Sequence, residues 1–252
     1  TSFYIHHEFL PKLRLLFREE SKATTWYKAL RKSSQLTKVE VQRVLDTYST
    51  IRGMFGLRFK VLDTSHVDLL RPIWHAISDD PFPENLTSDT WKQAGFQRDT
   101  PLTDLRRVGI LGVHTLQYMV TTYPNSFREL CRAAAPVPAG ASLGGYYPLA
   151  AVAINLTDVL VTRLGLFGEG ATDEYLPIFQ CFPLFLKTGD VFSELFSYSL
   201  VLFHQLWSEM KATYMEFPKV LAIWKDRLDE ILTRPPLRGS IRFLFDMIPP
   251  LS

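Results

Sequence analysis

Two arginines in the stretch GFQRDTPLTDLRRVG (Gly95–Gly109) are candidate contacts for an anion. The pattern predicts that Arg106 and Arg107 lie in the first turn of a helix, where unpaired N–H groups carry partial positive charge and disfavour cations. Two explanations remain open for this placement. In one, Arg106 pairs with Asp99 or Asp104 and joins the loop to the helix. In the other, Arg106 projects from a rigid helix end to meet an anion that a partner supplies.

The segment GASLG, with Ser142 at its centre, matches the GxSxG pattern of a hydrolase nucleophile. That chemistry requires an apolar strand before the serine and a helix directly after it. Here AAAPVPA precedes the match and GYYP follows it, and alanine and proline make a poor central strand. The sequence therefore favours a flexible loop, and a hydrolase built on Ser142 is an alternative to be excluded by experiment.

The histidines and cysteines are not spaced as in a metal site. His114 and His204 lie in helical patterns without a ligand partner one turn away, and no CxxC or HExxH motif is present. The sequence also lacks both GxxxxGK[ST] and a GxGxxG motif after a strand, so we expect no metal and no bound cofactor. Cys131 and Cys181 are far apart in the sequence, which fits a reducing, cytoplasmic compartment.

Charge is unevenly distributed along the chain. The net charge of +2 does not indicate a nucleic-acid-binding protein. Residues 1–60, however, contain 12 Lys and Arg against 5 Asp and Glu, whereas the remainder carries an acidic excess. This basic segment is either the solvated face of a helix or a contact for an acidic partner or an anionic membrane surface.

Apolar periodicity is helical almost throughout and predicts an all-α fold, a single multi-helix domain of roughly ten helices. Residues 1–60 are expected to form a basic helical segment that packs on a domain spanning 61–235, and residues 236–252 a C-terminal extension. Pro124 and Pro148 are placed to begin helices, and Asp190 to cap one. The apolar stretch 146–167 is broken by polar residues and predicts a buried helix, not a membrane span.

Local signals divide the arginine-bearing stretch into two helices. A short helix is expected to begin at Ser88 or Asp89 and to end at Gly95, and an extended run leads from there to Pro101. The next helix is expected to be capped by Thr103 or Asp104. Two glycines, Gly109 and Gly112, interrupt its apolar face, and such glycines are tolerated where another backbone must approach closely.

The order of residues in this stretch resembles the signature of the ELMO domain family. The pattern is W-x3-G-F-Q-x3-P-x-T-D-x-R-x-x-G, formed by Trp91, Gly95, Phe96, Gln97, Pro101, Thr103, Asp104, Arg106 and Gly109. The similarity continues in LLRPIW before the signature and in YPLAAVAINLTDVL (147–160) after it. It covers roughly residues 65–232, with several separated motifs in the correct order.

In the ELMO-domain-containing branch, the resemblance implies a GTPase-activating protein for small GTPases of the Arf family, including Arf-like ones. It assigns the catalytic role to Arg106, an arginine finger inserted into the GTPase. The chain would then act on a partner's active site and have no substrate of its own. Asp104 and Gln97 are expected to support the finger, one by orienting Arg106 and the other by bonding loop backbone.

Two positions depart from the family pattern. Arg107 follows the finger where the family usually has glycine, and Arg98 likewise replaces a common glycine after GFQ. If the glycine after the finger allows a partner backbone to come close, Arg107 would hinder that approach. Alternatively, Arg98 and Arg107 add contacts to a partner's phosphates or to a membrane.

The other branch of the family consists of scaffolds that join DOCK-type exchange factors to activate Rac. Those proteins carry armadillo-like repeats before the ELMO domain and a PH domain after it, for which these 252 residues leave no room. The GTPase-activating function is therefore preferred, with a non-catalytic scaffold that binds a small GTPase or a DOCK-type exchange factor as the alternative. Either would act in the cytoplasm, with organelle membranes as a candidate peripheral contact.

Overall fold

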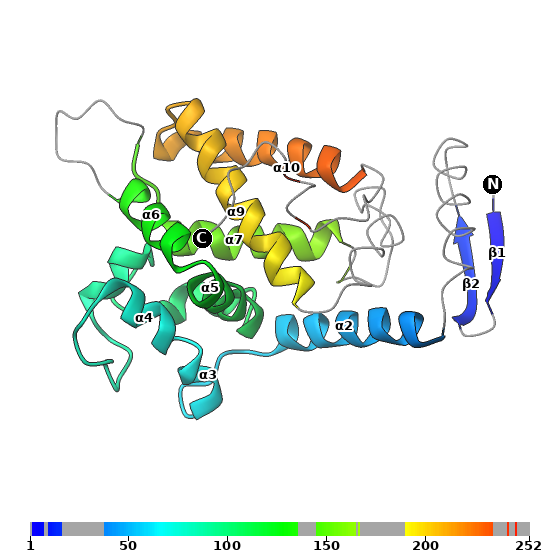
Figure 1. Ribbon diagram of the computed structural model, residues 1–252, viewed down its shortest axis with the longest axis horizontal. Coiled ribbons are helices and arrows are strands. Elements are labelled where there is room, and N and C mark those ends of the chain that lie inside the picture. The colour runs from blue at the N-terminus through cyan, green and yellow to red at the C-terminus, as the bar shows by residue number, and fades with distance from the viewer. Residues whose placement is uncertain are drawn as a thin grey trace.

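Helices form nearly all the regular structure in the part of the chain that the computed structural model describes (Figure 1). That part comprises residues 2–7, 10–16, 38–135, 145–164, 166, 190–233, 241 and 245. Its elements are β1 (Ser2–His7), β2 (Leu10–Leu16), α2 (Lys38–Gly56), α3 (Thr64–Asp68), α4 (Arg71–Ile77), the 3-10 helices η1 (Asp89–Ala94) and η2 (Pro101–Arg106), α5 (Ile110–Thr122), α6 (Pro124–Ala134), α7 (Leu149–Arg163), α9 (Val191–Glu209), the 3-10 helix η4 (Tyr214–Glu216) and α10 (Phe217–Thr233). The all-α class predicted for the domain is confirmed.

Three helices begin where the sequence predicts. Pro124 is the first residue of α6, and Pro148 directly precedes α7. The carboxylate of Asp190 caps α9 by accepting a hydrogen bond of 3.0 Å from the backbone N–H of Ser193. These positions suit their residues because proline has no N–H to leave unpaired and aspartate satisfies an N–H that has no partner within the helix.

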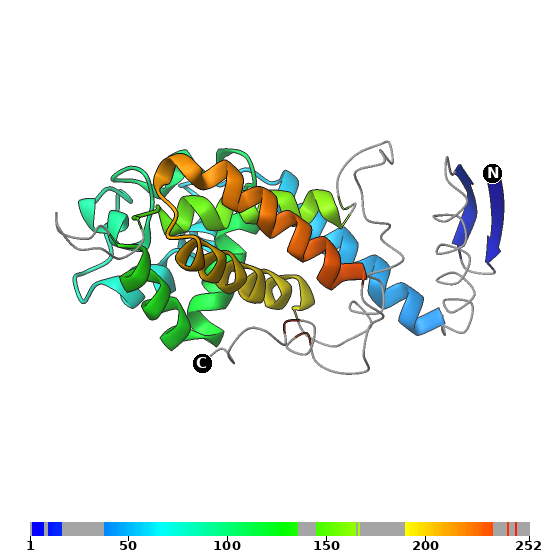
Figure 2. The ribbon, with the colours of Figure 1, turned by 90° about the horizontal axis from the view of Figure 1, so that it is seen from above.

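Helix α5 lies at the centre of the domain. Its side chains are mostly buried, and it contacts α2, α4, α6, α7 and α9. Helix α9 also contacts α10, and Figure 2 shows these two helices side by side. Four tryptophans are fully buried in the surrounding core, Trp74, Trp91, Trp207 and Trp224.

The N-terminal region differs from the expected helical segment. Strands β1 and β2 pair in an antiparallel hairpin, with Phe3 opposite Leu15 and Ile5 opposite Leu13. The expectation of helix is therefore wrong for residues 2–7 and 10–16. Alternating apolar residues with aromatic and β-branched side chains favour a strand there, whereas α2 has the longer helical pattern.

The hydrophobic core extends past the boundaries 61 and 235 expected for the domain. It includes Tyr48 and Ile51 of α2 and, near the C-terminus, Ile241 and Phe245. The second half of α2 is therefore part of the domain and not an addition to it.

Helix α7 is the buried helix predicted for the apolar stretch, and ten of its residues are buried. Over the described residues, no helix is both long enough and apolar enough to cross a membrane. The GASLG segment with Ser142, as well as Cys181, lies outside the described residues.

Candidate functional site

Trp91 anchors the arginine-bearing stretch in the core. Its ring is fully buried in η1 and meets Trp74 at 4.9 Å and Phe96 at 5.6 Å between centroids, both edge-on. Phe82 completes the cluster at 6.2 Å. Such edge-on aromatic contacts stabilise the fold by more than the burial of apolar area alone. They hold the start of the loop against the core.

Gly95 ends η1 as predicted and then ties the loop to α7. Its φ of 82° is in the left-handed region, where glycine is favoured. Its carbonyl accepts a hydrogen bond of 3.2 Å from the N–H of Ala151 in the first turn of α7. A Cβ at position 95 would collide with the backbone of Leu149, so the close approach excludes every other residue.

Asp104 holds the middle of the loop, and it bonds Gln97 instead of Arg106. Its Oδ2 accepts a hydrogen bond of 2.9 Å from the backbone N–H of Gln97. Burial raises the pKa of Asp104 above its ordinary value, while this hydrogen bond and the nearby charge of Arg98 act in the opposite direction. No contact between Asp104 and Arg106 supports the expectation that Asp104 orients Arg106. The carboxylate of Asp104 accepts its hydrogen bond from the loop backbone instead.

Arg106 lies at the end of a helix and not at its beginning. Thr100 caps η2, whose first residue is Pro101, so the helix starts before the expected caps Thr103 and Asp104. Arg106 falls in its last turn, where the partial negative charge of unpaired carbonyls favours a cation. The conflict that the sequence presents is thereby removed.

The side chain of Arg106 is exposed. Among the described residues it has no hydrogen bond and no ion pair, and the expected pairing with Asp99 or Asp104 is not formed. Nothing in the described part of the chain therefore neutralises this guanidinium group.

Arg107 has a partner although it is mostly exposed. Its Nε lies 2.8 Å from Oδ2 of Asp158 in α7, and the exposed fractions of the two side chains are 77% and 17%. Arg98, the other departure from the family pattern, is exposed. The two adjacent arginines thus differ: Arg107 is joined to α7, and Arg106 is left available.

Gly109 is the third fixed point of the stretch. It precedes α5 with a φ of 60°, and a Cβ there would collide with the carbonyl of Leu57. The next residue, Ile110, donates a backbone hydrogen bond of 3.0 Å to that same carbonyl. The expected close backbone approach exists at Gly109, whereas Gly112 faces the side chains of Val108 and Ile154.

A groove of about 270 Å³ runs beside the loop. Its lining includes Gln97 of the loop, residues of α7, the start of α10, and Tyr214 and Met215 of η4. Met215 is 84% exposed. An apolar groove with an exposed methionine in its lining is suited to contact with another protein.

Sequence reasoning did not find Asp158, Tyr214 or Met215. No local signal could have identified Asp158, because its contact joins segments far apart in the chain. The capping box of Thr213 and Glu216 was a usable signal, since it fixes a helix start and leaves the two residues between exposed.

Two of the histidines for which the sequence predicts no metal lie close to other polar side chains. His204 Nδ1 lies 2.8 Å from the hydroxyl of Tyr147, and His114 Nδ1 lies 3.4 Å from Asp190. The described residues contain no group of three or more His, Cys, Asp or Glu side chains that could hold a metal ion.

Comparison with known proteins assigns the family. The model of the ELMO/CED-12 family matches residues 50–221, which is more than half of the chain. ELMO domain-containing protein C of Dictyostelium discoideum is 25% identical over 263 residues, covering 100% of this chain and 38% of that protein. ELMO domain-containing protein 1 of Mus musculus is 26% identical over 186 residues, covering 68% of this chain and 55% of that protein.

A relative with a different type of name also matches. Engulfment and cell motility protein 3 of Bos taurus is 29% identical over 157 residues, covering 60% of this chain and 22% of that protein. The chain therefore spans between about a fifth and just over half the length of these relatives. With the family model matched across the arginine-bearing stretch, the chain belongs to the ELMO/CED-12 family.

Proposed function

We propose that the chain is a GTPase-activating protein for a small GTPase of the Arf family, with Arg106 as an arginine finger. The observation that carries the proposal is that Arg106 is exposed and, among the described residues, unpaired, although the loop around it is tied down. The resemblance of its motif to the ELMO-domain-containing branch supplies the type of partner.

The chemistry needs a cation of this kind. Hydrolysis of GTP builds negative charge on the oxygens of the transferred phosphoryl group, and an arginine supplied by a second protein stabilises it, accelerating the reaction by ~10³–10⁵. The guanidinium group is always charged and can bond two phosphate oxygens at once. A lysine in the same place would provide charge without this geometry.

The ties of the loop support the proposal because a backbone that is already held in place loses little conformational entropy on binding. The Gly95–Ala151 hydrogen bond, the Asp104–Gln97 hydrogen bond and the contact of Ile110 with Leu57 hold the backbone on both sides of Arg106. Preorganisation of this sort increases both affinity and rate.

The test is single-turnover GTP hydrolysis by a panel of GTP-loaded Arf and Arf-like GTPases. We expect Arg106→Ala and Arg106→Lys each to lose most of the acceleration, by ~10³ or more. Arg227→Ala, in the exposed Arg227–Glu230 pair of α10, is the matched control and should retain it. Unchanged thermal unfolding of Arg106→Ala would separate lost chemistry from lost folding, and full activity of Arg106→Ala would refute the finger assignment.

The position of Arg107 favours a second candidate function, a non-catalytic module that binds a small GTPase or a DOCK-type exchange factor. Its long side chain, 77% exposed, stands directly beside the finger where the family usually has glycine. Binding of a GTP-loaded GTPase or of a DOCK-type exchange factor, without acceleration for any GTPase, would support this alternative. Acceleration that appears only in Arg107→Gly would show a competent finger that its neighbour obstructs.

A further inference from the structure

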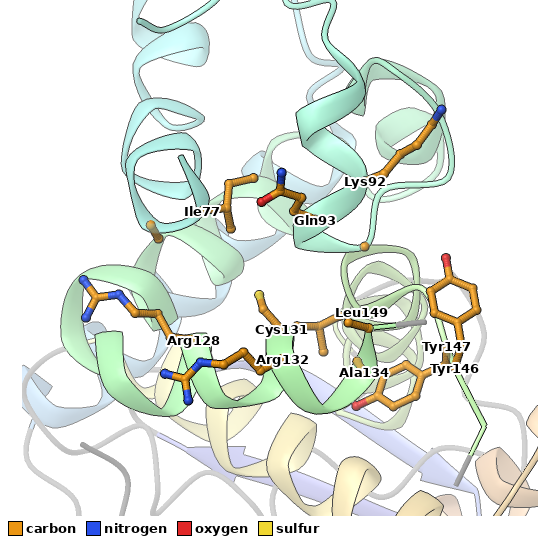
Figure 3. Close-up of a pocket in the computed structure, with 13 residues that line it drawn as sticks. Ile77, Lys92, Gln93, Arg128, Cys131, Arg132, Ala134, Tyr146, Tyr147 and Leu149 are labelled. Atoms are coloured by element: carbon orange, nitrogen blue, oxygen red, sulfur yellow. The ribbon is translucent and has the colours of Figure 1, made fainter. Parts of the chain in front are cut away.

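A second pocket, of about 510 Å³, has Gly95 in its lining (Figure 3). Its walls come from the end of α4, from η1, from α6 and from the residues that lead into α7. Most of its lining is apolar, including Ile77, Ala134 and Leu149. Pockets of roughly 300–1,000 Å³ with an apolar lining are typical of small-molecule sites.

Positive charge lines one edge of this pocket. Arg128 and Arg132 lie one turn apart on α6, and Figure 3 shows both side chains extending in the same direction along the pocket. Both are exposed, and neither has an ion pair with any described residue. Lys92 points away from the centre and pairs with Asp89.

No acidic side chain is found among the described residues that line the pocket. Its electrostatic character is therefore one-sided, with two uncompensated cations beside an apolar floor. An anionic head with an apolar tail complements both features, whereas a neutral apolar ligand would leave the arginines unused.

Cys131 also lines the pocket. Its sulfur points into the space between α6 and Gln93 (Figure 3). Burial raises the pKa of the Cys131 thiol to about 12, so the reactive thiolate is scarce at neutral pH. The thiol acts as a small apolar surface in the floor.

We propose that this pocket binds a single-chain anionic amphiphile, a free fatty acid, with its carboxylate on Arg128 and Arg132 and its chain against Ile77, Cys131 and Leu149. The two arginines suit a carboxylate because a guanidinium group can bond both of its oxygens. This ligand site is separate from the surface that carries Arg106 and does not depend on the GTPase-activating function.

Isothermal titration calorimetry of the whole chain with octanoate, decanoate and dodecanoate tests whether the pocket buries the apolar tail of the ligand. Each added methylene that is buried should tighten binding by about fourfold. Dodecyltrimethylammonium, with the same tail and the opposite charge, should bind at least tenfold more weakly than dodecanoate.

Two variants test the binding of the carboxylate by the arginines and the binding of the tail against Cys131. The double variant Arg128→Glu/Arg132→Glu changes only exposed side chains and should reverse the preference, so that the ammonium binds better than dodecanoate. Cys131→Phe should fill the pocket and abolish binding of dodecanoate, with a thermal melt to show that the protein remains folded. Arg227→Ala on α10 is the matched control and should bind like the unmodified chain.

Equal binding of dodecanoate and the ammonium, or affinity that does not change with chain length, would overturn the proposal. So would dodecanoate binding that survives in the folded Cys131→Phe variant and in the charge-reversed variant. If the chain instead sediments with phosphatidylserine vesicles through Arg128 and Arg132 and does not bind dodecanoate, the surface belongs to a bilayer and the fatty-acid site is rejected.

Discussion

Arg107 and Asp158 join the arginine-bearing loop to the middle of α7 through an ion pair of 2.8 Å between Nε and Oδ2. Because Arg107 is 77% exposed, solvent screens the pair and its contribution to stability is small. A double-mutant cycle of Arg107→Ala and Asp158→Ala in urea should give a coupling free energy of about 0.5–1 kcal/mol. Repeating the cycle in 1 M salt should reduce the coupling free energy toward zero. A coupling free energy that does not change with salt would contradict a solvent-screened ion pair.

Replacing Asp104 separates its hydrogen bond from its charge. Asp104→Ala removes the acceptor of the Gln97 N–H and should lower the free energy of unfolding by about 1 kcal/mol. Asp104→Asn keeps an oxygen in that place and removes the cost of burying a charge. At pH 7.5 it should therefore be at least as stable as the unmodified chain.

The pH dependence of Asp104 has a definite sign. Its pKa is raised in the folded state, so the folded protein binds this proton more tightly than the unfolded chain does. The unmodified chain should therefore gain stability relative to Asp104→Asn as pH falls from 7.5 through that raised pKa. Thermal melts of both proteins at pH 7.5 and at pH 4 measure the difference, and a gap that widens in favour of Asn at pH 4 would be inconsistent with it.

The two glycines with positive φ should not tolerate a side chain. Gly95→Ala and Gly109→Ala each impose left-handed strain of about 1–2 kcal/mol, and the new Cβ meets the backbone of Leu149 or Leu57. Each should lower the free energy of unfolding by more than about 2 kcal/mol in urea titrations. The matched control is Gly53→Ala in α2, where nothing lies within 4 Å. It should stabilise by about 0.5–1 kcal/mol, and equal effects at all three positions would refute the role of close contact.

His204 makes the fold sensitive to mild acid. Burial lowers its pKa, and its Nδ1 lies 2.8 Å from the hydroxyl of Tyr147. The unfolded chain therefore takes up this proton more readily than the folded protein, and stability is lost as pH falls below about 6.5, the ordinary pKa of histidine. His204→Asn keeps an acceptor near the Nδ1 position and cannot be protonated in this range. Between pH 7.5 and 5.5 it should lose less free energy of unfolding than the unmodified chain, and equal losses would point to other groups.

Helix starts with a local chemical cause were predictable from the sequence. Pro124, Pro148 and Asp190 act within one turn of their own positions, and each marks the beginning of α6, α7 or α9. The left-handed end of η1 at Gly95 is of the same kind. The all-α class follows because the apolar positions recur with the helical period over most of the chain.

The arrangement around Arg106 was not predictable by the same reasoning. Three residues could each cap a helix there, and the choice of Thr100 over Thr103 and Asp104 shifts Arg106 from a first turn to a last turn. Six residues of 3-10 helix are too few for periodicity to decide. Asp104 accepts a hydrogen bond from Gln97 and does not contact Arg106. That hydrogen bond depends on how the loop folds back and not on a local sequence pattern.

The hydrogen bond from Ala151 to the carbonyl of Gly95 has a consequence for the order of folding. Pro148 supplies no side-chain cap, so the start of α7 uses a carbonyl from the loop as one of its caps. This cap of α7 therefore depends on a contact between segments distant in sequence. A nascent chain that ends at Ala135 contains the whole arginine motif and lacks the N–H of Ala151. During synthesis, the Gly95–Ala151 hydrogen bond and the Arg107–Asp158 ion pair can therefore form only after α7 has been made.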